Sequence, residues 1–434
     1  MRKNKLLVFC LDALCSSDLK IMKELPNFKL LFENGSYVEH VESVYPSLTY
    51  PAHVSILTGT NIEKHGIYHN EILKAGKLQV PVFNDRQLIK GKLFTDYAKE
   101  HGYQTCSLSW PVTGHADIDL NMPMIVPINY HGNDPLTFMK GFATDELIEN
   151  YYWKYSRYLK GNDRSLDLYT MALAPGIIRD YHQPDVMLVK MCDLDTVRHN
   201  FGVYGNHVDA QLLKHDNEFG VLVESIKRYG DFANTNFIVL GDHGQTNIDH
   251  ILNINVILRQ HGFITVNDTN EIVAYDAYCH SCSLSAWIEL RDPNDTKIKK
   301  QVYELLNSLK NDPEIGIGHL YTKEEAQRLY HLTGPFDFII EGAKPIAFGS
   351  TYLGDDIFSD CDIHDYKTAI ASHGGLPFKD ETTTMIACGP MIKQGIRIER
   401  KQLVDIAPTM ARILGFAMND IDGQAIDELF KIGW

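Results

Sequence analysis

The sequence has no apolar run long enough to cross a bilayer, and it has little positive charge. Lys and Arg number 41 against 56 Asp and Glu, so the formal net charge over 434 residues is −15. The first feature predicts no membrane span. The second argues against nucleic acid as a partner held by bulk electrostatics. An acidic protein that binds anions must create its positive potential locally, and bound metal ions are one way to do so.

Cysteines are few, eight in the chain, and their spacing suggests no disulfide framework. Cys279 and Cys282 form a single C-x-x-C, which is a weak signal for a zinc or redox site without a second pair. The start of the chain is basic and then apolar, like a signal peptide, but Asp12 interrupts the apolar run and no small-residue cleavage site follows. We therefore expect a soluble protein in a reducing compartment, the cytoplasm.

Three short apolar runs are each followed closely by side chains that can bind metals. The runs cover residues 5–11, 185–192 and 235–241, a pattern typical of strands buried on both faces of a parallel sheet. The carboxyl ends of such strands lie at one edge of the sheet, where open α/β folds bind ligands. The side chains that follow the runs are Asp12, Asp195, His199, Asp242 and His243.

Three of these residues also have a simpler interpretation, whereas the adjacent pair Asp242 and His243 is harder to dismiss. Asp12 alone would more often cap a turn. Asp195 and His199 are four residues apart, so on a helix they would face the same way and could share only a hydrogen bond. Together with His373, in a glycine-flanked loop, the set gives six nitrogen and oxygen ligands, enough for two divalent cations.

Thr49 lies between two prolines at the predicted start of a helix. Pro51 suits the first helical turn, and Gly59 suits the end. A helix start presents unpaired N–H groups and attracts anions. Thr49 is therefore either an N-cap or a nucleophile for a phosphorus held there, and the short stretch alone favours the cap. Asn70, in a predicted loop, either forms a turn or donates its amide to a negative oxygen.

The remaining patterns predict a large α/β core with an insert. Residues 1–254 and 366–434 would form the core, and residues 255–365 a smaller α+β unit that selects substrate. The insert includes a capping box, Thr322 with Glu325. Further strands are predicted at 36–44, 104–110 and 382–388, helices at 88–102, 206–229 and 402–414, and a long loop at 112–135.

Taken together, these pieces resemble the alkaline phosphatase superfamily, specifically its type I phosphodiesterase/nucleotide pyrophosphatase branch. The resemblance spans most of the chain in the family's order, and the combination is specific although each piece alone is not. The pieces are Leu11-Asp12, Pro46 through His53, Thr58-Gly59, His65 through Asn70, Asp195 through Gly202, Gly241 through Gly244, and Ser372 through Gly374.

The resemblance implies a mostly parallel central sheet sandwiched by helices, and a two-zinc site on it, with manganese or iron as alternative metals. One zinc would be held by Asp195, His199 and His373. The other would be held by Asp12, Asp242 and His243, with the Thr49 oxygen as its remaining ligand. The implied reaction is cleavage of phosphodiester or pyrophosphate bonds in nucleotide-like substrates through a phospho-threonine. Asn70 would steady the transferring phosphoryl group.

Three positions are left open by the resemblance. Tyr50 matches an aromatic position that packs on a nucleoside base, but it could equally be ordinary core packing. Arg198 stands where the branch usually has glycine, and would be either a solvated charge or a partner of a substrate phosphate. Gln245 stands where methionine is expected. Other hypotheses are a phosphonate hydrolase or phosphomonoesterase on the same metals, and a non-catalytic metal- or phosphate-binding protein.

Overall fold

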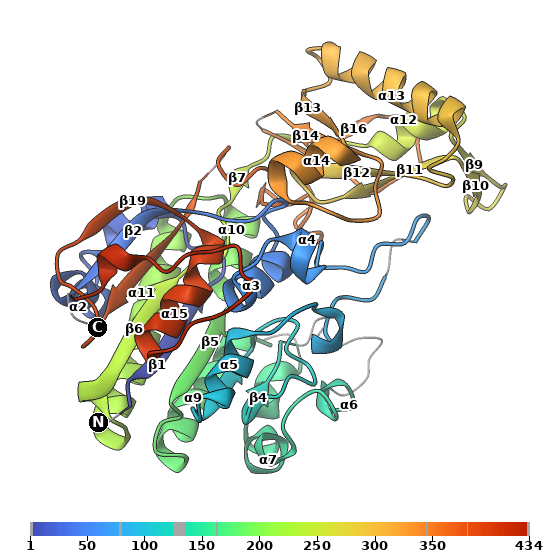
Figure 1. Cartoon of the computed structure of the whole chain (residues 1–434). Coiled ribbons are helices and arrows are strands. Elements are labelled where there is room, and N and C mark those ends of the chain that lie inside the picture. The colour runs from blue at the N-terminus through green and yellow to red at the C-terminus, as the bar shows by residue number, and fades with distance from the viewer. Residues whose placement is uncertain are drawn as a thin grey trace.

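A computed structural model describes residues 3–77, 80–124, 135–161, 164–343, 345–379 and 381–431. The chain forms a large α/β core with a smaller lobe beside it, drawn in yellow and orange in Figure 1. Among the described residues, no helix is long and apolar enough to cross a membrane. All eight cysteines lie in the described part of the chain as free thiols.

The core is built on an eight-stranded sheet in which one strand, β18, runs against the others. Its inner strands β1, β5 and β6 are in parallel register, with Phe9 opposite both Val189 and Val239. The predicted, mostly parallel sheet is therefore confirmed. In spatial order the strands are β19 (Arg397–Gln402), β2 (Gly35–Glu42), β18 (Thr383–Cys388), β6 (Thr235–Leu240), β1 (Lys5–Leu11), β5 (Val186–Met191), β3 (Thr105–Leu108) and β4 (Leu120–Met122).

Helices cover both faces of this sheet, because side chains alternate along the strands and both sets are apolar. Leu6 and Val8 of β1 belong to one hydrophobic cluster, and Leu7 and Phe9 belong to the other. On the first face lie α3 (Thr49–Thr58), α5 (Phe94–Glu100) and α15 (Ile406–Leu414). On the second face lie α2 (Pro26–Asn34), α9 (Leu166–Asp180) and α11 (Asn206–Tyr229).

Short helices fill the connections of the core. The helix α10 (Asp193–Phe201) follows β5 directly and starts at the sheet edge that carries the predicted ligands. The others are α1 (Leu19–Met22), α4 (Ile62–His65), α6 (Pro135–Met139), α7 (Asp145–Leu147) and α8 (Trp153–Tyr155).

The smaller lobe is an antiparallel sheet with helices, which confirms the predicted α+β unit as part of the fold. Its main sheet has the order β11 (Ala277–Ser281), β12 (Ser285–Leu290), β14 (Phe338–Gly342) and β13 (Ile317–Thr322). A hairpin pairs β9 (Ile264–Val266) with β10 (Ile272–Tyr275). The helices are α12 (Ile254–Gln260), α13 (Thr296–Asn311) and α14 (Lys323–Tyr330). The capping box at Thr322 and Glu325 is present at the start of α14.

Two small sheets join the lobe to the core. β8 (His250–Leu252) pairs with β15 (Ile346–Phe348) and β16 (Phe358–Ser359). β7 (Thr246–Asn247), on the way out of the core, pairs with β17 (Ala371–Ser372), on the way back. The outgoing and returning segments therefore lie together next to the predicted site. The division at residues 255 and 365 stays a prediction.

Two predicted elements are wrong in extent. The helix predicted over 88–102 begins only at Phe94. Gly91 has φ +82, a left-handed conformation that a right-handed helix cannot include. The stretch 112–135, predicted as a loop, contains β4, which extends the sheet by pairing with β3. Residues 125–134 of that stretch lie outside the described residues.

Candidate active site

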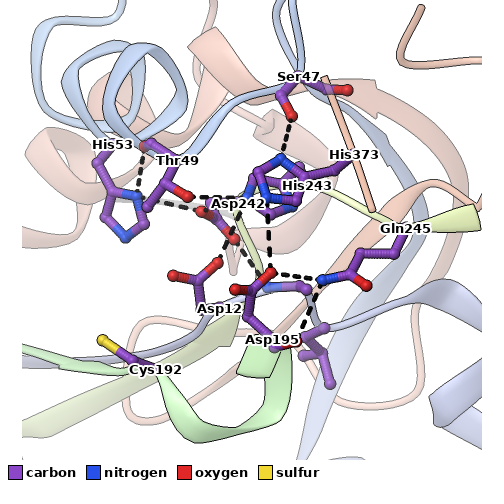
Figure 2. A network of polar contacts seen from close by, with 12 residues as sticks. Asp12, Ser47, Thr49, His53, Cys192, Asp195, Asp242, His243, Gln245 and His373 are labelled. Carbon is purple, nitrogen blue, oxygen red and sulfur yellow. Dashed lines mark hydrogen bonds and ion pairs between the residues drawn. The ribbon is translucent and has the colours of Figure 1, made fainter. Parts of the chain in front are cut away.

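Thr49 is the first residue of α3, and its hydroxyl points at the predicted metal ligands. The preceding Leu48 is extended (φ −110, ψ 150) and is the N-cap, so Thr49 does not have the capping role that the local pattern favours. Its Oγ1 lies 3.1 Å from Nε2 of His243, and Figure 2 draws this contact as a dashed line. The helix ends at Gly59, whose φ of +67 gives the left-handed C-terminal cap expected there.

The ends of β1 and β6 bring together the first cluster of ligand-type atoms. Asp12 follows β1, and Asp242 and His243 follow β6. Nε2 of His243 lies 3.3 Å from both Asp12 Oδ1 and Asp242 Oδ2. These side chains are buried, and their ligand atoms are close enough to surround one ion. The convergence at one sheet edge follows from the parallel register of the two strands.

A second cluster lies beside the first and is built from α10 and the loop after β17. Asp195 Oδ1 lies 3.6 Å from His373 Nε2, and Asp195 Oδ2 lies 3.2 Å from His199 Nε2. The rings of His243 and His373 stack with their centroids 3.8 Å apart, so the two clusters are adjacent. Asp195, His243 and His373 also have ligand atoms within reach of one ion. The six predicted metal ligands therefore lie together: Figure 2 shows Asp12, Asp195, Asp242, His243 and His373 beside Thr49, and His199 contacts Asp195.

The polar atoms of these clusters fit bound cations. Asp12 Oδ1, Asp242 Oδ2 and His199 Nε2 are buried and make no well-aligned hydrogen bond within the described part of the chain, although each lies 3.2–3.3 Å from a carboxylate or imidazole atom of the site. A buried polar atom without a partner is costly, and native proteins rarely leave several of them in one place. Carboxylate oxygens and imidazole nitrogens are the donors that zinc and similar divalent ions accept. The donor set and its unsatisfied atoms therefore suit two divalent ions.

Burial and neighbouring charge shift the pKa values of the clustered groups. Burial and the nearby Asp242 carboxylate raise the pKa of Asp12. Burial, together with the adjacent His243, lowers the pKa of His373 to about 3. Burial would raise the pKa of Asp195, but the neighbouring imidazoles, His199 first, outweigh it and lower that pKa. His373 is therefore neutral at physiological pH, with the free nitrogen lone pair that metal ligation requires.

Three polar residues that the sequence reasoning did not assign to the site hold the ligands in place. Gln245 Nε2 donates to Asp195 Oδ1 at 2.5 Å, which accounts for a glutamine at this position. Lys190 Nζ donates to Asp12 Oδ2 at 2.5 Å. His53 Nδ1 lies 3.2 Å from Asp242 Oδ2 and 2.8 Å from the Thr49 carbonyl oxygen. In the sequence, Lys190 is visible as a charged residue inside an otherwise apolar run, and Gln245 as a departure from the methionine expected there.

Arg198 has neither of the two roles predicted for it. Its side chain is fully buried, so it is not a solvated charge. It donates to both carboxylate oxygens of Asp18, at 2.7 Å each, and to Cys15 Sγ at 2.5 Å. Because the side chain is fully buried and both terminal nitrogens are bound, the guanidinium does not face a substrate phosphate, although its Nε has no partner within the described part of the chain. The correction follows from Asp18, a partner 180 residues away in the sequence.

Asn70 and Tyr50 lie next to Thr49. Asn70 Oδ1 accepts the Tyr50 backbone N–H at 2.9 Å, which orients the Asn70 amide at the start of α3. The Tyr50 side chain is buried in the hydrophobic core, which is the packing interpretation. Its hydroxyl is buried without a partner among the described residues. Stacking of Tyr50 on a substrate base stays a prediction.

Comparison with known proteins agrees with this geometry. The family model for type I phosphodiesterase / nucleotide pyrophosphatase matches residues 6–345. The chain belongs to this family. It is therefore an enzyme, a phosphoric ester hydrolase, and the family is metal-dependent.

Similar proteins and structures cover nearly the whole chain. Human bis(5'-adenosyl)-triphosphatase ENPP4 is 25% identical over 437 residues, which is 96% of this chain and 80% of that protein. Ectonucleotide pyrophosphatase/phosphodiesterase family member 7 from Rattus norvegicus is 21% identical over 422 residues, 92% of this chain and 81% of that protein. The structure of human ENPP5 superimposes with a TM-score of 0.68 at 17% identity, over 98% of this chain and all of that one. That structural match confirms the alkaline-phosphatase-like fold.

Proposed function

We propose that this phosphodiesterase/nucleotide pyrophosphatase uses two divalent ions, zinc in the first instance, and forms a phospho-threonine on Thr49. The observation that carries the proposal is the position of the Thr49 hydroxyl, 3.1 Å from His243 Nε2 and at the mouth of two adjacent ligand clusters. A hydroxyl that served only to start a helix would not need six ligand-type side chains around it.

The resemblance to the family divides these residues between two ions. Asp195, His199 and His373 would hold one ion, and Asp12, Asp242 and His243 the other, with Thr49 beside the second. The ions would supply positive charge that lowers the pKa of a bound hydroxyl and neutralises phosphoryl oxygens. Manganese or iron would satisfy the same ligands.

The reaction on the protein's side is a double displacement at phosphorus. Thr49 Oγ1 attacks, the bond between phosphorus and the leaving oxygen breaks, and the leaving oxygen takes up a proton. Water then attacks the phospho-threonine, and the bond from phosphorus to Thr49 breaks. The amide nitrogen of Asn70, whose oxygen is held by the Tyr50 N–H, would donate to a phosphoryl oxygen in both steps.

The relatives support nucleotide-like substrates. Human ENPP4 is named as a bis(5'-adenosyl)-triphosphatase, and an inactive form of murine ENPP5 has been solved in complex with AMP. We therefore propose that this enzyme cleaves phosphodiester or pyrophosphate bonds beside a nucleoside. The cytoplasmic location also stays a prediction, which the eight free cysteines support.

The decisive experiment measures bis-p-nitrophenyl phosphate and a dinucleoside triphosphate with wild type, Thr49→Ala and Thr49→Ser. We expect Thr49→Ala to lose at least about a thousandfold in kcat and Thr49→Ser to keep part of it. Rapid quench and mass spectrometry should find phosphate on the peptide that contains Thr49.

Thr58→Ala is the matched control, because Thr58 lies at the other end of the same helix, where its hydroxyl donates to the Val54 carbonyl and accepts from Thr60. Thr58→Ala should keep kcat within about twofold, as a substitution away from the reacting atoms. If Thr49→Ala kept the wild-type turnover, the assignment of Thr49 as the nucleophile would be wrong. Hydrolysis by protein that contains no transition metal would overturn the two-ion site.

A further inference from the structure

Lys190 is a buried cation in the middle of the central sheet. All six residues of β5 are buried, and Lys190 is 1% exposed. An ammonium group is rarely placed there, because removing its charge from water is costly unless a partner is present. The partner is Asp12, one of the six ligand-type residues, whose Oδ2 lies 2.5 Å from Nζ.

The Lys190 side chain lies on the same face of the sheet as the helix that carries Thr49. Side chains alternate along a strand, and Leu188, two residues earlier, packs in the cluster that contains Val54 and Ile56 of α3. Burial raises the pKa of the Tyr50 hydroxyl, and the charge of Lys190 partly opposes that rise, which places the two groups within electrostatic reach. The ammonium thus lies under the start of α3.

The ammonium has one strong acceptor and two weak ones. Beyond Asp12, Nζ contacts Cys192 Sγ at 3.0 Å and Met124 Sδ at 3.6 Å. Sulfur is a poor hydrogen-bond acceptor, whereas a phosphate oxygen is a strong one. Because its donors already face Asp12, Cys192 and Met124, Lys190 acts on the site through its charge.

Lys190 changes the net charge of the site by one unit. The three carboxylates of the site are Asp12, Asp195 and Asp242, and with Lys190 they carry a net charge of −2. Two divalent ions bring the site to +2, with Thr49 still protonated. Without the lysine the sum would be +1. A phosphodiester carries one negative charge, whereas a terminal phosphoryl group carries close to two at neutral pH.

We propose that Lys190 sets the charge of the site for a dianionic phosphoryl group, so that the enzyme also hydrolyses phosphomonoesters. The inference rests on the two-ion function proposed above. In this reaction Thr49 Oγ1 bonds to phosphorus as the ester P–O bond breaks, and the released alkoxide takes up a proton. Water then breaks the bond from Thr49 to phosphorus, and inorganic phosphate leaves. No oxidant, reductant or third substrate is required.

The test compares p-nitrophenyl phosphate with bis-p-nitrophenyl phosphate in wild type, Lys190→Met and Lys190→Arg. Methionine keeps much of the length and the buried character of lysine and removes the charge. We expect Lys190→Met to lower kcat/KM for the monoester about tenfold more than kcat/KM for the diester, and Lys190→Arg to keep the wild-type ratio more closely. Lys5→Met is the matched control. It removes a half-buried Lys–Asp pair, Lys5 with Asp185, at the opposite end of the same two strands.

A second readout does not depend on turnover. Titration of zinc into metal-free protein against a chromogenic chelator should give two ions per chain for wild type and for Lys190→Met. The variant should bind more tightly, because Asp12 no longer shares its charge with an ammonium. An unchanged substrate ratio in Lys190→Met, loss of a zinc ion, or no monoester hydrolysis by wild type would each overturn the inference. The nucleophile would still stand in these cases if Thr49→Ala is inactive.

Discussion

Arg198 and Asp18 form a fully buried ion pair, with the guanidinium 2.7 Å from each carboxylate oxygen. Arg198 belongs to α10, which carries Asp195 and His199. Asp18 belongs to the segment that follows β1 and Asp12. The pair therefore ties the element that holds one ligand cluster to the segment that follows the other.

We expect Arg198→Ala to lower the free energy of unfolding by about 3–5 kcal/mol, because it leaves the buried Asp18 carboxylate without a charged partner, with only the Cys15 N–H donating to it. Urea denaturation measures this change. The control is Arg397→Ala, which breaks an exposed pair with Glu39 and should cost about 1 kcal/mol or less. Equal losses in the two variants would show that the buried pair has no special role.

Gln245→Leu should weaken binding of one of the two ions. The glutamine amide donates to Asp195 Oδ1, and residues that hold a metal ligand in this way typically change metal affinity about 10- to 100-fold. Chelator competition should show one weakened ion and one unchanged ion. Gln260→Leu, which removes an exposed amide in the smaller lobe, is the control. Two equally weakened ions would contradict a role confined to Asp195.

Removal of metal should destabilise the folded protein. Asp12 and Asp242 have buried oxygens that make no well-aligned hydrogen bond in the described part of the chain, and ions would satisfy them. At a free zinc concentration about 100 times Kd, each site adds about 2.7 kcal/mol to folded-state stability. Calorimetry before and after chelation, followed by zinc addition, measures the effect. A melting temperature that changes neither on chelation nor on zinc addition would contradict the proposed two-ion site.

Glu341 should make stability depend on pH. It accepts hydrogen bonds from the Tyr45 hydroxyl and the Leu376 N–H, and burial raises its pKa to about 7 from an ordinary 4.5. An acid with a raised folded-state pKa favours folding fully below its unfolded pKa. Its contribution is lost as pH rises through the folded pKa. Between pH 4.5 and 7 the wild type should therefore lose about 2–3 kcal/mol relative to Glu341→Gln. Parallel stability curves for the two proteins would refute this.

The core strands were predictable because their signals are local. Residues 5–11 form β1 with the predicted bounds, since a continuous apolar run ends at a single charged residue, Asp12. The helix over 206–229 also has the predicted bounds. The convergence of the ligands followed from the same reasoning, because parallel strands must end at one edge. Thr49 and His373 were candidates from their local patterns, and the resemblance to a family implied their roles.

What the sequence did not reveal depends on contacts between distant residues. Asp18 binds Arg198 across 180 positions, and Lys190 binds Asp12 across 178. Neither pair leaves a periodic pattern. β4 was missed for a related reason: it has only three residues and exists because β3 offers it a free edge. The local sequence pattern indicates which residues are buried and where turns occur. It does not indicate which distant residue a side chain or strand will pair with in the folded protein.

The two-residue ribbon of β7 and β17 has an evolutionary consequence. The chain leaves the core just after His243 and returns to it just before His373. The two crossing segments, β7 and β17, are paired with each other. A lobe attached in this manner can lengthen, shorten or be replaced, because the pairing of β7 with β17 still fixes the distance between His243 and His373. During evolution the lobe, and with it the substrates that the lobe contacts, can therefore change while the catalytic residues stay the same.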